Sequence, residues 1–63
     1  MLIKLRSSED RNFIYVNISH IRYVKLRDIH YGRGSEIHFK DIENFITVLD
    51  TPQEIEEKVN KLL

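Results

Sequence analysis

Short segments in which apolar and polar residues alternate occupy most of the chain, a pattern typical of half-buried β-strands. Ile3 and Leu5 alternate with basic residues, and Ile37 and Phe39 alternate with polar ones. The links between segments are too short for parallel crossovers, which need a dozen or more residues. We therefore expect an antiparallel meander of four or five strands, open or curled into a small partial barrel, over residues 2–6, 12–17, 21–27, 35–40 and 45–49.

The end of the chain predicts one amphipathic α-helix over about residues 52–62. Thr51 suits the N-cap, Pro52 suits the first helical position, and Glu54 completes a capping box. Apolar residues then form one stripe on an otherwise charged segment: Ile55, Val59 and Leu62. Such a stripe packs on a sheet. The expected fold class is therefore α+β, with residues 1–63 as a single small domain.

The second expected strand is apolar on both of its faces. Phe13 and Tyr15 share one face, and Ile14 and Val16 share the other. A strand of this kind is central or covered by a partner. A 63-residue chain buries only about 60% of the surface that its unfolded form exposes, and this one has no cysteine for disulfides. We therefore expect self-association to supply further burial.

Charge is balanced overall but divided along the chain. Residues 1–40 hold eight basic and four acidic residues, whereas residues 41–63 hold two basic and six acidic ones. This polarity suits a polyanion, a second copy of the chain, or simply solvated strand ends and helix surfaces. No apolar run is long enough to cross a bilayer, and the N-terminus is too short and too alternating for a signal peptide. We expect an unprocessed cytoplasmic protein with no membrane partner.

Candidate catalytic and metal-binding residues are few. His20, His30 and His38 match no local metal-ligand spacing. Ser19, His20 and Asp28 are the residue types of a hydrolase triad, but so small a chain has little volume for a substrate pocket. If the hairpin turns at residues 32–33, Asp28 faces His38 as a surface charge pair. We predict no enzyme activity, no catalytic residue, no metal site and no cofactor.

A nucleic-acid interface is the alternative function. Stacking aromatics interleaved with cations hold single strands, and the candidate residues here are Arg22, Tyr23, Lys25, Arg27 and Arg33. Arg22 and Tyr23 point to opposite faces of a strand, and ten basic against ten acidic residues is not the basic balance of a typical nucleic-acid-binding domain. The segment Tyr31–Gly34 predicts a hairpin tip, with an anion-binding nest around Arg33 as its alternative.

The order of these segments resembles the FlbD-like small flagellar proteins, also called swarming motility proteins. The resemblance rests on an N-terminal strand, an aromatic strand ending in Val-Asn, an Ile-x-x-Val segment, and a strand leading into a capped helix with Glu-Glu and Lys-Val: Met1–Leu5, Phe13–Asn17, Ile21–Val24 and Ile46–Val59. It implies a bacterial, non-catalytic accessory or regulatory protein, and no functional residue carries over.

Together, these observations predict a small, non-catalytic cytoplasmic binding or regulatory module that works as a homo-oligomer. Its expected partner is itself or another protein. The alternative is a module that binds single-stranded nucleic acid, RNA above all, through a basic, tyrosine-bearing face of the sheet.

Overall fold

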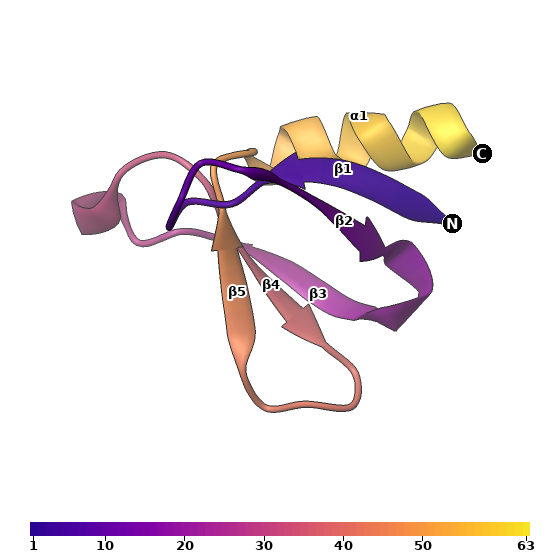
Figure 1. Cartoon of the computed structure of the whole chain (residues 1–63), viewed down its shortest axis with the longest axis horizontal. Coiled ribbons are helices and arrows are strands. Elements are labelled where there is room, and N and C mark those ends of the chain that lie inside the picture. The colour runs from indigo at the N-terminus through magenta and orange to yellow at the C-terminus, as the bar shows by residue number, and fades with distance from the viewer.

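A computed structural model describes residues 1–63, apart from the side chain of Ile29. Five strands precede one C-terminal helix (Figure 1): β1 (Leu2–Arg6), β2 (Phe13–Asn17), β3 (Ile21–Leu26), β4 (Ser35–Phe39), β5 (Phe45–Val48) and α1 (Pro52–Leu62). The expected α+β class, the antiparallel strands and the C-terminal helix are confirmed. No described helix is both long enough and apolar enough to cross a membrane.

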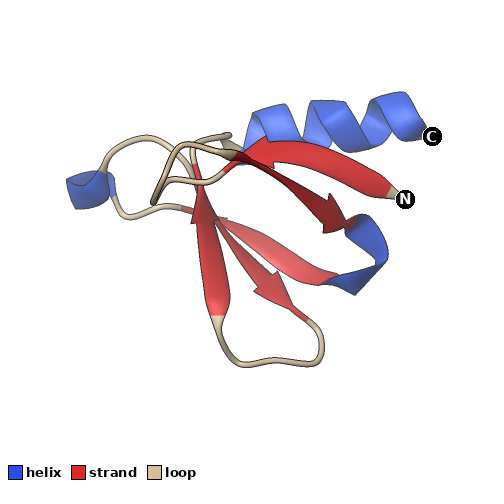
Figure 2. Ribbon diagram, viewed as in Figure 1, coloured by secondary structure: helices blue, strands red, loops and turns tan.

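The strands form two open antiparallel sheets (Figure 2). β1 pairs with β2, and β3, β4 and β5 follow one another in the second sheet. The chain passes between the sheets through a short 3₁₀ helix, Ile18–His20. The Asn17 carboxamide oxygen starts this turn, because it accepts hydrogen bonds from the Ser19 amide at 3.1 Å and the Ser19 hydroxyl at 2.8 Å.

One corner joins the two sheets. An isolated bridge pairs Ser7 with Val48, and the Leu49 amide donates to the Arg6 carbonyl at 2.8 Å. Beyond this corner β1 and β5 diverge. Side chains, and not another strand, then form hydrogen bonds with the outward backbone groups of β1. The Arg6 amide donates to Asp50 Oδ1 at 2.9 Å, and Lys58 Nζ donates to the Lys4 carbonyl at 2.6 Å and to Asp50 Oδ2 at 2.8 Å. Where α1 lies against β1, the Arg6 amide and the Lys4 carbonyl therefore both have hydrogen-bond partners.

The core lies between the inner faces of the sheets and the helix. Its buried apolar side chains come from β1, β2, β4, β5 and α1: Ile3, Leu5, Val16, Ile37, Val48 and Ile55. The period-2 pattern of the strands places these residues inward and their polar neighbours outward. So small a core is consistent with the modest burial expected of a chain of this length.

Helix α1 begins with the capping box expected from the sequence. The Glu54 amide donates to Thr51 Oγ1 at 3.2 Å, and the Thr51 amide donates to Glu54 Oε1 at 2.9 Å. Ile55 is buried and Val59 is partly buried against the core, but Leu62 is 37% exposed. The apolar stripe therefore covers the core along the first two turns, and α1 contacts β1 and β3 there.

The link between β3 and β4 overturns one expected pairing. Leu26 pairs with Ser35 and the Arg27 amide donates to the Gly34 carbonyl, so the hairpin turns about residues 30–31 and places Tyr23, not Asp28, opposite His38. A bulge between Ile21 and Tyr23 lies at the other end of β3. The Asp28 carboxylate accepts a hydrogen bond from the His30 amide at 2.9 Å. The expected Asp28–His38 charge pair was wrong because the hairpin turns earlier than its glycines and Asp28 lies in the loop.

Candidate functional site

Two cations and two aromatic rings share the outer face of the β1–β2 hairpin. Lys4 lies opposite Tyr15, and Arg6 lies opposite Phe13. The centroid of the Phe13 ring is 4.1 Å from Lys4 Nζ and 4.4 Å from Arg6 Cζ, distances typical of cation–π contacts. Phe13 is 51% exposed and Tyr15 is 64% exposed. We call these four residues the hairpin face.

Strand β2 also leaves one edge unpaired, which we call the β2 edge. Among the described strands, only β1 pairs with it. The bonds from the Ser7 amide to the Asn12 carbonyl and from the Ile18 amide to the Met1 carbonyl mark the hydrogen-bonded pairs of the ladder. Because bonded and non-bonded pairs alternate, the backbone groups of Phe13, Tyr15 and Asn17 point away from β1. This edge of β2 is open to a further strand.

The edge of β3 differs from the β2 edge. Arg22 is the extra residue of its bulge, and Lys25 adds a charge on the outer face. Helix α1 flanks the strand, and a shallow groove of about 330 Å³ separates the two, lined by Val24, Pro52, Ile55, Glu56, Val59 and Asn60. Bulges, charges and neighbouring helices are the features with which proteins protect free edges.

The outer face of the three-stranded sheet carries a row of stacked rings. Tyr23, His38 and Phe45 lie opposite one another in the registers of β3, β4 and β5. The ring centroids are 4.4 Å apart for Tyr23 and His38 and 4.8 Å apart for His38 and Phe45. His38 Nε2 lies 3.1 Å from Glu36 Oε1. These rings contact one another, and Tyr23 and Phe45 remain 48% and 47% exposed.

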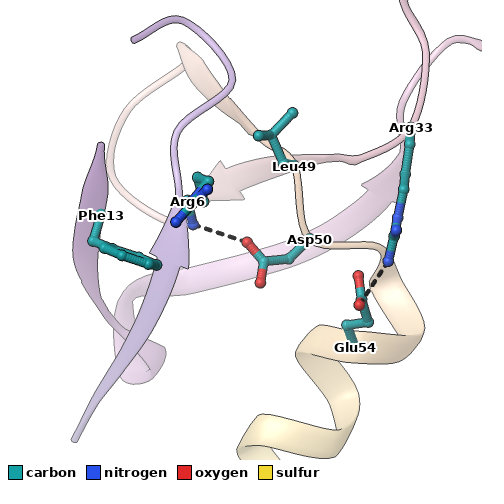
Figure 3. A pocket seen from close by; sticks show the side chains of 6 residues that line it. All are labelled: Arg6, Phe13, Arg33, Leu49, Asp50 and Glu54. Carbon is teal, nitrogen blue, oxygen red and sulfur yellow. Dashed lines mark hydrogen bonds and ion pairs between the residues drawn. The ribbon is translucent and has the colours of Figure 1, made fainter. Parts of the chain in front are cut away.

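A depression of about 240 Å³ lies where β1, β2 and the start of α1 meet (Figure 3), lined by Arg6, Phe13, Arg33, Leu49, Asp50 and Glu54. Its two carboxylates are engaged within the chain. Asp50 contacts the Arg6 amide and Lys58, and Glu54 lies 2.6 Å from Arg33. The backbone amide of Thr51, and next Arg33, lower the pKa of Glu54. These contacts hold the start of α1 in place.

The residues expected to bind nucleic acid lie in β3 and in the loop that follows it. Tyr23 and Lys25 lie on the outer face of β3, and Arg22 lies in its bulge. Arg27 Cζ is 5.9 Å from the centroid of the Tyr31 ring, in the loop beyond β3. Arg33 is the partner of Glu54 at the helix start (Figure 3).

The loop between β3 and β4 forms a hairpin tip, and its two glycines have a structural role. Gly32 and Gly34 both have positive φ, 92° and 139°. A Cβ on Gly34 would overlap the carbonyl oxygen of Val48, so the backbone of β5 lies directly against this glycine. The Arg33 guanidinium, the expected charge of an anion nest, already contacts a carboxylate.

The hairpin face was missed in the sequence, although its signal is present there. Lys4 and Arg6 occupy the outward positions of the first strand, and Phe13 and Tyr15 lie on one face of the second. Combining them requires the register, which the turn at Ser7–Asn12 sets.

The residues considered for metal or triad chemistry lie apart from one another or serve the backbone. Ser19 hydrogen-bonds to Asn17 in the 3₁₀ turn, and Asp28 accepts from the His30 amide. Among the described residues, no group of three or more histidine, cysteine or carboxylate side chains gathers in an arrangement that suits a metal ion.

Comparison with known proteins finds no matching family model, no matching curated protein and no matching solved structure. The resemblance to the FlbD-like proteins therefore stays a prediction.

Proposed function

We propose that this protein is a small, non-catalytic binding or regulatory module that works in the cytoplasm as a homo-oligomer. The observation that carries the proposal is strand β2, which combines exposed Phe13 and Tyr15 side chains with an unpaired backbone edge. Exposed aromatic surface and a free strand edge are both features of sites that bind another protein. The regulatory part of the proposal rests on the resemblance to small flagellar proteins.

The size of the core supports self-association. Leu5, Ile37 and Val48 are fully buried. Large apolar side chains of β1 and β2 remain exposed to solvent: Leu2, Phe13 and Tyr15. Domains of this size gain stability from staples or from oligomerisation. With no cysteine in the chain, a second subunit is the simplest source of additional buried surface.

Light scattering coupled to size-exclusion chromatography tests this proposal on the whole chain. We expect a mass above that of the 7.6 kDa monomer at micromolar concentration, falling toward the monomer on dilution. A folded protein that stays monomeric up to the highest soluble concentration contradicts the oligomer.

Binding of single-stranded nucleic acid is the second candidate function, and the hairpin face favours it. Lys4 and Arg6 flank Phe13, and Tyr15 presents an exposed ring beside them. Neither cation belongs to an ion pair identified within the described residues. A strip of cations and rings is how sheets hold single strands.

Fluorescence anisotropy with labelled mixed-sequence oligonucleotides at low salt distinguishes this candidate. We expect Lys4→Gln with Arg6→Gln to weaken binding about tenfold or more, because phosphate contacts and their counterion release are lost. The matched control, Arg22→Gln with Arg27→Gln, removes the same charge from β3 and its loop and is expected to have a much smaller effect. No binding by the unaltered protein at low salt rejects the candidate.

A further inference from the structure

We propose that two copies of this chain pair through their β2 edges, antiparallel and about a two-fold axis that passes beside Tyr15. The result is a continuous four-stranded sheet in the order β1, β2, β2 and β1. This inference rests on the proposed homo-oligomer and names its interface.

The position of Tyr15 makes this pairing self-complementary. Tyr15 is the central residue of β2, which runs from Phe13 to Asn17. Its backbone amide and carbonyl point away from β1, as the alternation of the β1–β2 ladder requires. A residue with this orientation can exchange both of its backbone hydrogen bonds with the same residue of a second copy. A two-fold axis through that pair places Phe13 opposite Asn17 of the second copy.

The composition of β2 contains nothing that opposes the contact. Its five residues include no charge, no proline and no bulge. Those are the usual devices that keep two free edges apart. Like charges therefore do not meet along the strand, and each outward backbone group of one copy finds a partner in the other.

Charges at the two ends of β2 complement one another across the axis. The turn before β2 carries Glu9 and Asp10 together with Arg11, so its net charge is negative. The chain after β2 carries the formal charge of Arg22, in the bulge of β3. Antiparallel pairing brings the acidic turn of one copy toward the 3₁₀ turn that leads to Arg22 in the other, and the symmetry repeats this contact. Charge complementarity thus favours a second copy in this orientation.

Pairing would also cover the most exposed ring of the strand. The two Tyr15 side chains lie side by side on the outer face, because directly opposite residues of an antiparallel pair point the same way. Each ring is 64% exposed in the single chain. The two hairpin faces then join into one surface with four cations and four aromatic rings.

Cysteine cross-linking reads the register directly, because the natural chain has no cysteine. In Tyr15→Cys the two introduced thiols lie across the axis, within the Cα separation that a disulfide tolerates. In the matched control Phe13→Cys, the same pairing keeps the thiols about 13 Å apart along the strand. With a mild oxidant, we expect Tyr15→Cys to form disulfide dimers about tenfold faster or more than Phe13→Cys on non-reducing gels.

A proline variant tests the edge independently. Tyr15→Pro removes an amide that points away from β1, so the intramolecular ladder keeps its bonds while the intermolecular one loses two. We expect the circular dichroism of a folded chain and a monomeric mass by light scattering. If this variant does not fold, the cross-linking rates of Tyr15→Cys and Phe13→Cys test the interface.

The outcomes separate this inference from the proposed function. Preferential cross-linking of Tyr15→Cys supports the β2 interface. An oligomer in which both cysteine variants cross-link at equal rates, or neither does, overturns the β2 interface but retains the homo-oligomer. A monomeric unaltered chain overturns both.

Discussion

The three-stranded sheet and the β1–β2 hairpin both contribute buried side chains to one core, but they differ in how their outer surfaces are satisfied. In the sheet of β3, β4 and β5, the rings of Tyr23, His38 and Phe45 stack on one another. In the hairpin, Phe13 contacts two cations while Tyr15 stays largely exposed. The rings of the sheet cover one another in part, with Tyr23 48% and Phe45 47% exposed, whereas Tyr15 of the hairpin is 64% exposed and lies on a strand with an unpaired edge.

The backbone follows the same division. The free edge of β3 has a bulge, a charge and a flanking helix, whereas β2 has an unpaired, uncharged edge. An edge without such protection persists in natural proteins when it is used or covered. Changes in the three-stranded sheet should therefore affect folding most, and changes on the outer side of β2 should affect association most.

Gly34→Ala should have the largest effect on folding. The new methyl group would overlap the Val48 carbonyl, and alanine disfavours the φ of 139°. Left-handed strain and overpacking together predict a loss of about 3 kcal/mol or more in the free energy of unfolding. Urea denaturation measures this loss. The control is Gly32→Ala, where φ is 92° but nothing lies within 4 Å of the added carbon, so only the strain applies. Equal losses in the two variants would contradict the close approach of β5.

Ser35→Ala should cause the next largest loss of stability. Ser35 is fully buried, and its hydroxyl donates to the Asp50 carbonyl at 2.7 Å. Removing the donor leaves a carbonyl without its partner at the junction of β5 and α1, which predicts a loss of about 1–3 kcal/mol. Denaturation of Ser19→Ala, which removes an exposed hydroxyl from the 3₁₀ turn, provides the comparison and should change stability by about 0.5 kcal/mol or less. A larger loss in Ser19→Ala would reverse the ranking of the two regions.

Arg11→Gly should stabilise the hairpin. Arg11 closes the β1–β2 turn with a φ of 62°, a conformation that costs a non-glycine residue about 1–2 kcal/mol. Part of the gain is offset by the greater freedom of glycine in the unfolded chain, so we expect a net increase of about 0.5–1 kcal/mol in the free energy of unfolding. Arg11→Ala removes the same charge without relieving the backbone and should show no such gain. An equal gain in both variants would assign the effect to charge.

The parts of the fold that could be predicted from the sequence are those that local chemistry determines. The start of the helix follows from Thr51, Pro52 and Glu54, whose capping contacts lie within one turn. The strands follow from the alternation of their side chains. By contrast, the division into two sheets depends on the Asn17 turn and on the Ser7–Val48 bridge, which joins residues far apart in the chain.

The candidate site was harder to predict because it depends on register. Counting back from the glycines misplaced Asp28, because Leu26 pairs with Ser35 and the hairpin therefore turns about residues 30–31, which leaves Asp28 in the loop. The residues expected to bind nucleic acid were grouped because they are close in the sequence. The chain leaves β3 at Leu26, however, so Arg27 and Arg33 lie in the loop and not in the strand. The hairpin face joins residues of two strands, and only the pairing of Lys4 with Tyr15 and Arg6 with Phe13 brings them together.

Tyr15→Lys should have the smallest effect on folding and a clear effect on association. The Tyr15 side chain points outward and is 64% exposed, so its replacement should change the free energy of unfolding by about 0.5 kcal/mol or less. Two lysines would face each other across the proposed axis, and we expect the association constant to fall about tenfold or more, or about 1.4 kcal/mol. Analytical ultracentrifugation measures the association. The matched control is Tyr23→Lys, which places the same charge at a 48% exposed tyrosine of β3 and should leave association unchanged. If Tyr23→Lys weakened association while Tyr15→Lys did not, the three-stranded sheet, and not the β1–β2 hairpin, would form the contact between copies.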